Sequence, residues 1–68
     1  MIGTNEELTA REKLVLMKMA LGMLNKDIAR ELHVSMGAIS TYTREILRKL
    51  GSLNIKEAIY VAAKNNLI

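Results

Sequence analysis

Helix start and stop signals recur along this chain and divide it into four intervals, which constrains its fold more than any other sequence feature. Thr9 and Glu12 have the spacing of a capping box, in which two side chains satisfy backbone N–H groups at a helix start. Further residues able to cap a helix start, or to end a helix in a left-handed conformation, follow at intervals: Gly22, Asn25, Ser35, Gly51 and Asn54. These signals predict helices over residues 10–21, 26–32, 36–50 and 54 to about 65.

The residue types favour an all-α fold. No segment alternates apolar and polar residues for long enough to predict a strand, and proline is absent. Hydrophobic residues make up 50% of the chain but only two residues are aromatic, so the core must be aliphatic and rich in methionine. With 68 residues and no cysteine for disulfides, helix packing or a partner subunit must supply the stability. We expect a small four-helix bundle that forms a single domain over residues 1–68.

Several classes of function lack the residues they need. A single histidine, His33, cannot hold a structural metal alone, and no cysteine is present, so we expect no metal and no cofactor. The chain has no glycine-rich phosphate loop and no nucleophile with a base at useful spacing, which argues against an enzyme. It has no apolar run long enough for a membrane span, and its start, MIGTNEEL, lacks the order of a signal peptide. We therefore expect a cytoplasmic protein without a membrane partner, whose net charge of +3 is compatible with nucleic acid.

Residues 25–50 have the spacing of a helix-turn-helix. Ala29 is small at the point where two helices crossing at a steep angle must approach closely. The apolar residues that can seal this corner are Ile28, Leu32, Val34 and Ile39. His33 falls in the turn, where many such motifs have glycine, and histidine tolerates a left-handed backbone better than most residues. We interpret His33 as a turn residue and not as a ligand or a base.

A projection of residues 36–50 at about 100° per residue separates two faces. One face is apolar, with Tyr42 at its edge, and comprises Ile39, Thr43, Ile46, Leu47 and Leu50. The opposite face is small, polar and doubly basic, and comprises Gly37, Ser40, Thr41, Arg44 and Arg48. Such a face suits insertion into a DNA major groove, and the two arginines can take a base edge, a phosphate or one of each. An ordinary solvated face is the alternative that this helix alone leaves open.

The segments LTAREKLVL, NKDIA and VS, followed by KL and EA, span residue 8 to about residue 62. In these segments the chain resembles the LuxR/GerE-type DNA-binding domain, which is also the output domain of NarL-type response regulators. The segments align with the pattern of that family without a gap. The resemblance implies a four-helix bundle whose third helix enters the major groove and whose fourth helix serves dimerisation. It therefore implies a bacterial, sequence-specific transcription regulator that binds double-stranded DNA as a homodimer on paired half-sites.

One departure from the family pattern bears on DNA recognition. The family most often has a lysine that contacts DNA where this chain has Ser40, so a helpful charge is missing. Arg44 matches a position that is commonly basic, and Lys26 can reach a phosphate from the N-terminal turn of the second helix, whose dipole favours an anion. Specificity must then depend on Thr41, Arg44 and groove shape. The predicted DNA-contacting residues are Lys26, Ser35, Gly37, Ser40, Thr41, Arg44 and Arg48.

The first helix carries a candidate surface for protein contacts. Leu14, Met17 and Leu21 form an apolar stripe that is distinct from the expected core face. That core face comprises Glu12, Val15, Leu16, Met19, Ala20 and Met23. The stripe suits a regulatory domain, a second subunit or a partner protein, whereas scattered exposed hydrophobic residues are the other interpretation. It keeps open a second function, a protein-interaction module that uses the same fold to bind and modulate another regulator.

The fourth helix has two faces as well. Its expected core-facing residues are Ile55, Ala58, Ile59 and Ala62, and its expected outward residues are Tyr60, Val61, Lys64 and Leu67. Three of the outward residues, Tyr60, Val61 and Lys64, form the predicted dimer contact. A partly exposed helix end is the alternative interpretation.

Overall fold

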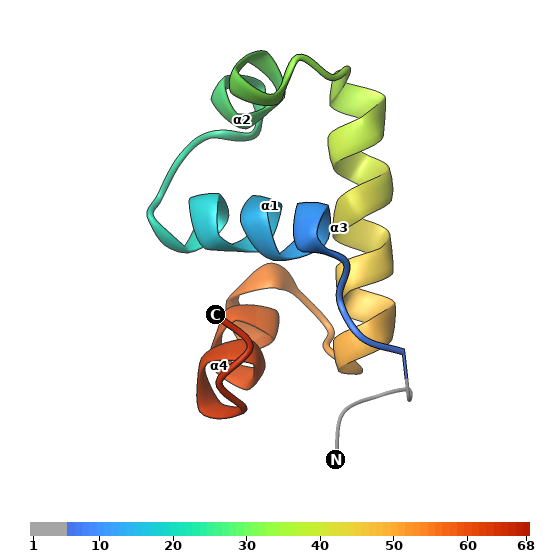
Figure 1. Cartoon of the computed structure of the whole chain (residues 1–68), viewed down its shortest axis with the longest axis vertical. Coiled ribbons are helices and arrows are strands. Elements are labelled where there is room, and N and C mark those ends of the chain that lie inside the picture. The colour runs from blue at the N-terminus through green and yellow to red at the C-terminus, as the bar shows by residue number, and fades with distance from the viewer. Residues whose placement is uncertain (1–5) are drawn as a thin grey trace.

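The computed structural model describes residues 6–68, which form four α-helices and, over that range, no β-strand. The helices are α1 (Ala10–Ala20), α2 (Asn25–Leu32), α3 (Met36–Leu50) and α4 (Ile55–Lys64). In Figure 1, α1 crosses α3 near its middle, α2 lies beside the N-terminal end of α3, and α4 lies beside its C-terminal end. The prediction of an all-α fold with four helices is confirmed. The prediction that the start of the chain, MIGTNEEL, is not a signal peptide concerns residues 1–5 in part, and these lie outside the described residues.

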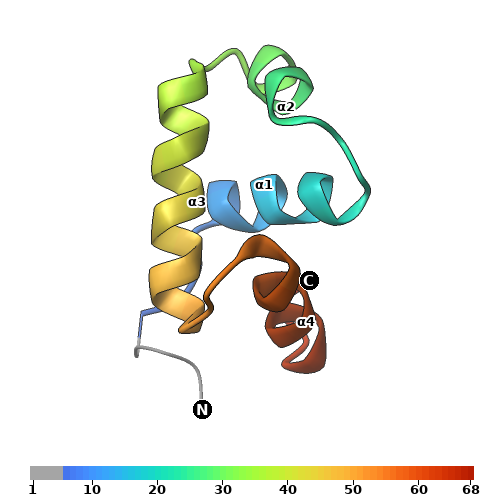
Figure 2. The ribbon, with the colours of Figure 1, turned by 180° about the vertical axis from the view of Figure 1, so that it is seen from behind.

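The centre of the fold is the crossing of α1 and α3, each of which contacts all three other helices. Figure 2 shows the same arrangement from behind, with α2 and α4 at opposite ends of α3. The buried core is aliphatic, as predicted, and comprises Leu8, Val15, Leu16, Ile28, Ala29, Ile39, Ile46, Leu50, Ala58 and Ala62. The predicted richness in methionine is wrong, because Met19 and Met23 only pack against this core as partly buried residues, and Met17 and Met36 are exposed. Because the core takes only one side of α3, the opposite side of this helix remains exposed to solvent.

Side chains close to the starts of α1, α3 and α4 accept hydrogen bonds from backbone N–H groups there. The Thr9 hydroxyl accepts a hydrogen bond from the Glu12 N–H at 3.1 Å, and the Glu12 carboxylate accepts one from the Thr9 N–H at 2.9 Å. The Ser35 hydroxyl accepts from the Ala38 N–H at 3.0 Å, and Asn54 caps α4 in the same way. The predicted capping box and two of the predicted caps are therefore confirmed.

The predicted cap at Asn25 is wrong. Asn25 is the first residue of α2, and the N-cap position belongs to Leu24, whose side chain makes no capping hydrogen bond. The helix begins one residue early because the Leu24 carbonyl already accepts from the N–H groups of Asp27 at 2.9 Å and Ile28 at 3.0 Å. The N-terminal turn of α2 thus has no side-chain acceptor at its cap.

The turn between α2 and α3 depends on a left-handed residue, as predicted. His33 has φ 58° and ψ 43°, and it ends α2. This backbone conformation lets the Val34 N–H donate to the Ala29 carbonyl at 2.9 Å, which closes the turn over the helix end. Gly22 and Gly51 also have positive φ, at 86° and 60°, and follow α1 and α3.

Three details of the core differ from the sequence prediction. Ala20 is exposed because α1 ends there and the chain turns away at Gly22. Val61 and Leu67 are partly buried against the core and not fully outward. The chain folds back after α4, where the Leu67 N–H donates to the Ala62 carbonyl at 2.8 Å, and this brings Leu67 inward.

The Thr43 hydroxyl oxygen is buried and, within residues 6–68, has no hydrogen-bond partner.

Among the described residues, no helix combines the length and the apolar character that crossing a membrane requires.

Candidate nucleic-acid interface

The exposed face of α3 contains the residues that the helical projection placed there. Gly37, Ser40, Thr41, Arg44 and Arg48 are all exposed, whereas the opposite face is buried in the core. With a rise of about 1.5 Å per residue, Arg44 lies roughly 10 Å along the helix from Gly37, and Arg48 lies about 6 Å further. The face is therefore small at its N-terminal end and basic from its middle onwards.

Hydrogen bonds in α3 and at its N-cap determine which hydroxyl donors and acceptors remain for a ligand. The Thr41 hydroxyl donates to the Gly37 carbonyl at 3.1 Å, so its oxygen is left to accept. The Ser35 hydroxyl accepts the capping bond from Ala38 and keeps its own proton for donation. Gly37 leaves room in front of the first turn. A Cβ placed on it would meet only the Ser35 Oγ, at 3.6 Å.

Most cations of the helix-turn-helix are paired with carboxylates. Arg30 lies 3.5 Å from Asp27, Lys49 is 2.8 Å from Glu12, and Arg48 contacts two carboxylates. Within the described residues 25–50, Lys26 and Arg44 are the two cations without an ion pair. Both are exposed, and both belong to the predicted DNA-contacting set.

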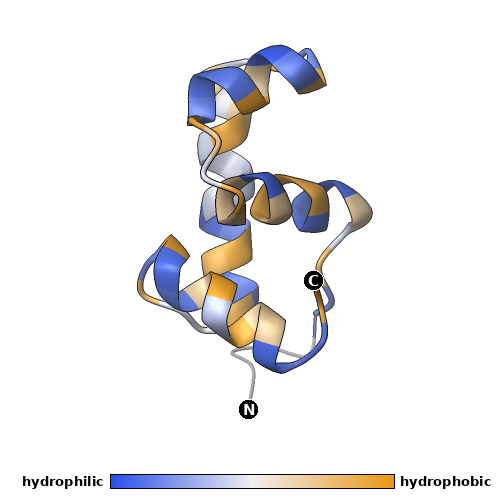
Figure 3. Cartoon of the chain, turned by 90° about the vertical axis from the view of Figure 1, so that its left-hand side faces the viewer, coloured by the Kyte–Doolittle hydropathy of each residue, from blue (hydrophilic) through white to orange (hydrophobic). Residues whose placement is uncertain are grey.

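Lys26 occupies the first turn of α2, which Figure 3 shows as largely hydrophilic. The N-cap residue Leu24 provides no side-chain acceptor, and its carbonyl accepts from Asp27 and Ile28. Among the described residues, the N–H groups of Asn25 and Lys26 are therefore left for an acceptor from outside. Asp27 in the same turn adds a negative charge, and Arg30 lies beside it at 3.5 Å. Lys26 and the helix dipole together favour an anion at this end.

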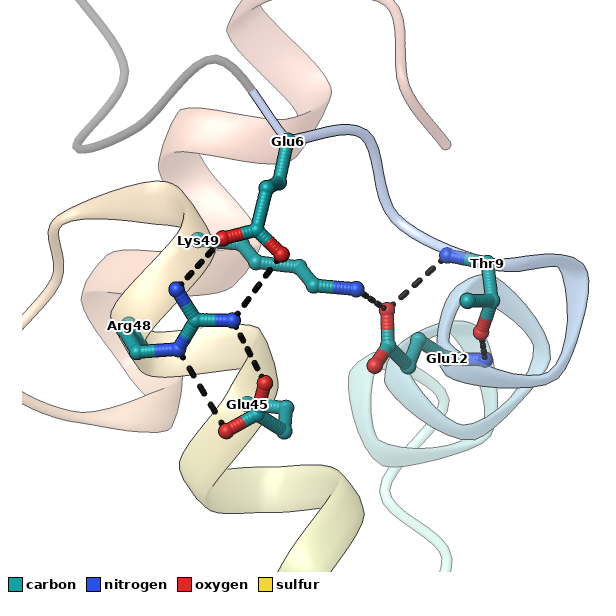
Figure 4. Close-up of polar contacts among 6 residues, drawn as sticks. All are labelled: Glu6, Thr9, Glu12, Glu45, Arg48 and Lys49. Carbon is teal, nitrogen blue, oxygen red and sulfur yellow. Dashed lines mark hydrogen bonds and ion pairs between the residues drawn. The ribbon is translucent and has the colours of Figure 1, made fainter.

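Arg48 is held by two carboxylates at the C-terminal end of the exposed face. Its Nη1 and Nη2 donate to the two carboxylate oxygens of Glu6 at 2.7 and 3.1 Å, and Nη2 also donates to Glu45 Oε1 at 2.6 Å (Figure 4). These hydrogen bonds from Arg48 lower the pKa of Glu6 and of Glu45, and they raise the pKa of Arg48. The sequence analysis predicted that Arg48 contacts DNA. In the structure its guanidinium is hydrogen-bonded to Glu6 and Glu45.

Next to the Arg48 cluster, a buried ion pair between Lys49 and Glu12 joins α3 to α1. The Lys49 Nζ donates to Glu12 Oε1 at 2.8 Å, and both side chains are buried between α1 and α3 (Figure 4). The same carboxylate oxygen accepts from the Thr9 N–H, so the start of α1 is tied to the end of α3. Sequence reasoning placed Glu12 in the capping box and on the core face, but it did not find Lys49 as its partner.

The two predicted protein-contact surfaces differ in exposure. The predicted stripe is exposed, with Leu14 and Met17 in α1 and Leu21, which is 80% exposed, directly after it. On α4, Tyr60 is 64% exposed, and the Lys64 ammonium lies 5.8 Å from the centre of its ring. Val61, the third residue of the predicted dimer contact, is instead partly buried against the core.

Comparison with known proteins places this site in a family. Residues 6–62 match the family described as bacterial regulatory proteins, luxR family. The chain belongs to the LuxR family. The match contains the whole helix-turn-helix, and it begins at Glu6, the partner of Arg48.

Relatives of this LuxR-family chain are named as regulators. The chain is 43% identical over 60 residues to the virulence-factor transcription regulator BvgA of Bordetella pertussis, covering 88% of this chain and 29% of that protein. It is 38% identical to the transcriptional regulatory protein YvfU of Bacillus subtilis, covering 100% and 34%. It is 35% identical to the response regulator VraR of Staphylococcus aureus, covering 93% and 30%. The chain therefore spans about a third of the length of these relatives.

A solved structure shares the fold of this LuxR-family domain. The response regulator ChrA of a heme-sensing two-component system superposes with a TM-score of 0.88 at 32% identity. The superposition covers 96% of this chain and 32% of that one. The four-helix arrangement with its helix-turn-helix is thus shared with part of a response regulator.

Proposed function

We propose that this chain is a sequence-specific DNA-binding domain of a bacterial transcription regulator, with α3 in the major groove. The observation that carries the proposal is the exposed face of α3, where small residues precede Arg44, which has no ion pair among the described residues. The domain comprises residues 1–68, with the helix-turn-helix at about 25–50, and it works without a cofactor. Family membership supports the same function.

The dimensions of α3 suit the groove. An α-helix with its side chains is about 10–12 Å across, and the major groove is about 12 Å wide and 8.5 Å deep. Gly37 and Ser40 keep the leading part of α3 slim, which lets the backbone approach the bases. Thr41 and Arg44 then lie where side chains reach base edges.

Arg44 and Lys26, the two cations of residues 25–50 without an ion pair in the described part of the chain, take different roles. Arg44 projects from the groove-facing side of α3 and provides a base or phosphate contact, whereas Lys26 meets a phosphate at the N-terminus of α2. Ser35, at the start of α3, donates its hydroxyl proton to the DNA backbone. Because Ser40 carries no charge, affinity is modest and specificity rests on Thr41, Arg44 and the shape of the groove.

Charge-matched variants test this division of roles. Arg44→Ala should lower affinity by about 1–3 kcal/mol and broaden the set of bound sequences, whereas Lys26→Ala should weaken binding equally on all sequences. Lys56→Ala on α4 is the matched control, because Lys56 is exposed and unpaired among the described residues. Affinities are measured on duplexes selected from a random pool. Equal behaviour of the Arg44 and Lys56 variants would show that the face is wrongly assigned.

The proposed regulator binds paired half-sites as a homodimer through α4. One groove-entering helix reads too few base pairs for discrimination in a genome, and two half-sites supply the rest. Tyr60 and Lys64 are the exposed members of the predicted contact, and Val61 packs behind them. Tyr60→Glu should abolish cooperative binding to a two-half-site duplex and leave binding to one half-site unchanged. Cooperative binding that survives this change would exclude α4 as the dimer contact.

A second candidate function is a protein-interaction module that binds another regulator through α1. The exposure of Leu14 and Met17 in α1 and of Leu21 directly after it favours this function. Replacing Met17 with a glutamine distinguishes the candidates, since this exposed change should leave DNA binding intact. Loss of regulation in cells together with intact DNA binding would support a partner on this stripe. Absence of DNA binding by the unaltered chain would make the interaction module the main function.

A further inference from the structure

We propose that the carboxylate of Glu6 competes with DNA for Arg48, so that the segment before α1 restrains DNA binding until a phosphate displaces it. This inference rests on the proposed function, because it requires α3 to face DNA. It adds a regulatory contact between two parts of the chain that are 42 residues apart.

The geometry of the cluster makes Glu6 a direct competitor of a phosphate. Arg48 presents both of its terminal nitrogens to the two oxygens of Glu6, at 2.7 and 3.1 Å (Figure 4). A phosphate is recognised by arginine through the same pair of parallel hydrogen bonds. The two acceptors therefore need the same N–H groups and exclude each other on that edge of the guanidinium.

The position of Arg48 brings the competition to the DNA surface. Arg48 lies one turn beyond Arg44 on the exposed face of α3, which is where a helix leaves the groove and passes a phosphate backbone. Arg48 carries a charge of +1, and its partners Glu6 and Glu45 carry −1 each, so the cluster of these three residues has a net charge of −1. Duplex DNA carries one negative charge per roughly 1.7 Å of its axis, so this cluster repels the backbone unless Glu6 moves away.

The contact is exposed enough to exchange without unfolding the domain. The side chains of Arg48 and Glu6 are 44% and 55% exposed, and ion pairs of this kind are weak and screened by salt. Glu6 precedes the first residue of α1 by four positions, so its departure changes the path of the chain entering α1 and not the helix itself. The buried pair of Lys49 and Glu12 meanwhile keeps α1 against α3.

A neighbouring glutamate provides the matched control for the experiment. Glu6→Gln and Glu7→Gln each remove one negative charge from the same segment, but Glu7 has no ion-pair partner within residues 6–68. Duplex DNA affinity is measured for both variants over a series of salt concentrations, with the wild type alongside. The measurements are repeated in a background carrying Arg48→Ala.

The Glu6→Gln variant should bind DNA several-fold more tightly than the Glu7→Gln variant at low salt. The difference in affinity between the two variants should narrow as the salt concentration rises, because salt screens the ion pair of Glu6 and Arg48. This difference should vanish in the Arg48→Ala background. Equal affinity of the two glutamine variants at all salt concentrations, weaker binding by Glu6→Gln, or a difference that survives Arg48→Ala would each overturn the inference.

The proposed function fails in a different way. If the wild type shows no salt-dependent DNA binding, both the function and this inference are refuted. If the wild type binds and Arg44→Ala impairs it, while Glu6→Gln and Glu7→Gln remain identical, only the competition between Glu6 and DNA is refuted.

Discussion

Replacing Lys49 with methionine should lower the free energy of unfolding by about 3–5 kcal/mol, because it leaves Glu12 as a buried charge without its partner. Glu12 and Lys49 are 5% and 7% exposed, and their charged atoms are 2.8 Å apart. Methionine fills a similar volume, so the loss arises from the stranded carboxylate and not from a cavity. The hydrogen bond that the Glu12 carboxylate still accepts from the Thr9 N–H does not neutralise the charge.

This loss is large for a domain of this size. At about 0.05–0.15 kcal/mol per residue, a chain of this length has a total stability of roughly 3–10 kcal/mol. The Lys49→Met variant should therefore be marginally folded, with a melting temperature lower by at least about 12 °C. Urea denaturation followed by far-ultraviolet circular dichroism measures the difference in unfolding free energy.

A double variant separates the stranded charge from other causes. Glu12→Gln combined with Lys49→Met removes both charges, while glutamine still offers an oxygen to the Thr9 N–H in the capping box. We expect the double variant to lie within about 1 kcal/mol of the wild type. A double variant as unstable as Lys49→Met alone, or a single variant that loses less than about 1 kcal/mol, would refute the reasoning.

Three further outcomes follow from single residues. His33→Gly should raise stability by up to about 1 kcal/mol in the same assay, because relief of the left-handed backbone exceeds the entropy of glycine; a loss would contradict this. Thr43→Val should raise stability by about 1 kcal/mol, since Thr43 Oγ1 is buried without a partner among the described residues; unchanged or lower stability would argue against it. Arg48 lowers the pKa of Glu6 and Glu45 below 4.5, so their stabilisation is present above that pH and is lost as pH falls through the lowered values. Acid unfolding should show this additional loss in the wild type and not in Arg48→Ala.

The sequence predicted the local structure of this domain well, because caps and turns depend on residues three or four positions apart. The capping box of Thr9 and Glu12, the cap at Ser35 and the left-handed His33 all follow from such short spacings. The buried and exposed faces of α3 follow from its periodicity. The failure at Asn25 is also local, since the Leu24 carbonyl starts the helix before the asparagine side chain can cap it.

The ion pairs between helices were not predictable in the same way. Glu12 and Lys49 are 37 residues apart, and Glu6 and Arg48 are 42 apart, so each pair depends on how α1 crosses α3. Periodicity places a charge on a face but does not select its partner on another helix. The partial burial of Leu67 likewise arises from the return of the chain after α4, which no helical projection contains. The DNA-contacting residues stay a prediction.

The most direct test of DNA binding is the salt dependence of the affinity of the unmodified chain for duplex DNA. With Lys26, Arg44 and Arg48 as the phosphate-neutralising cations, log affinity should fall linearly with log salt, with a slope of roughly −2 to −3 at about −0.9 per contact. A slope indistinguishable from zero, or no binding even at low salt, would contradict the assignment of the α3 face to DNA.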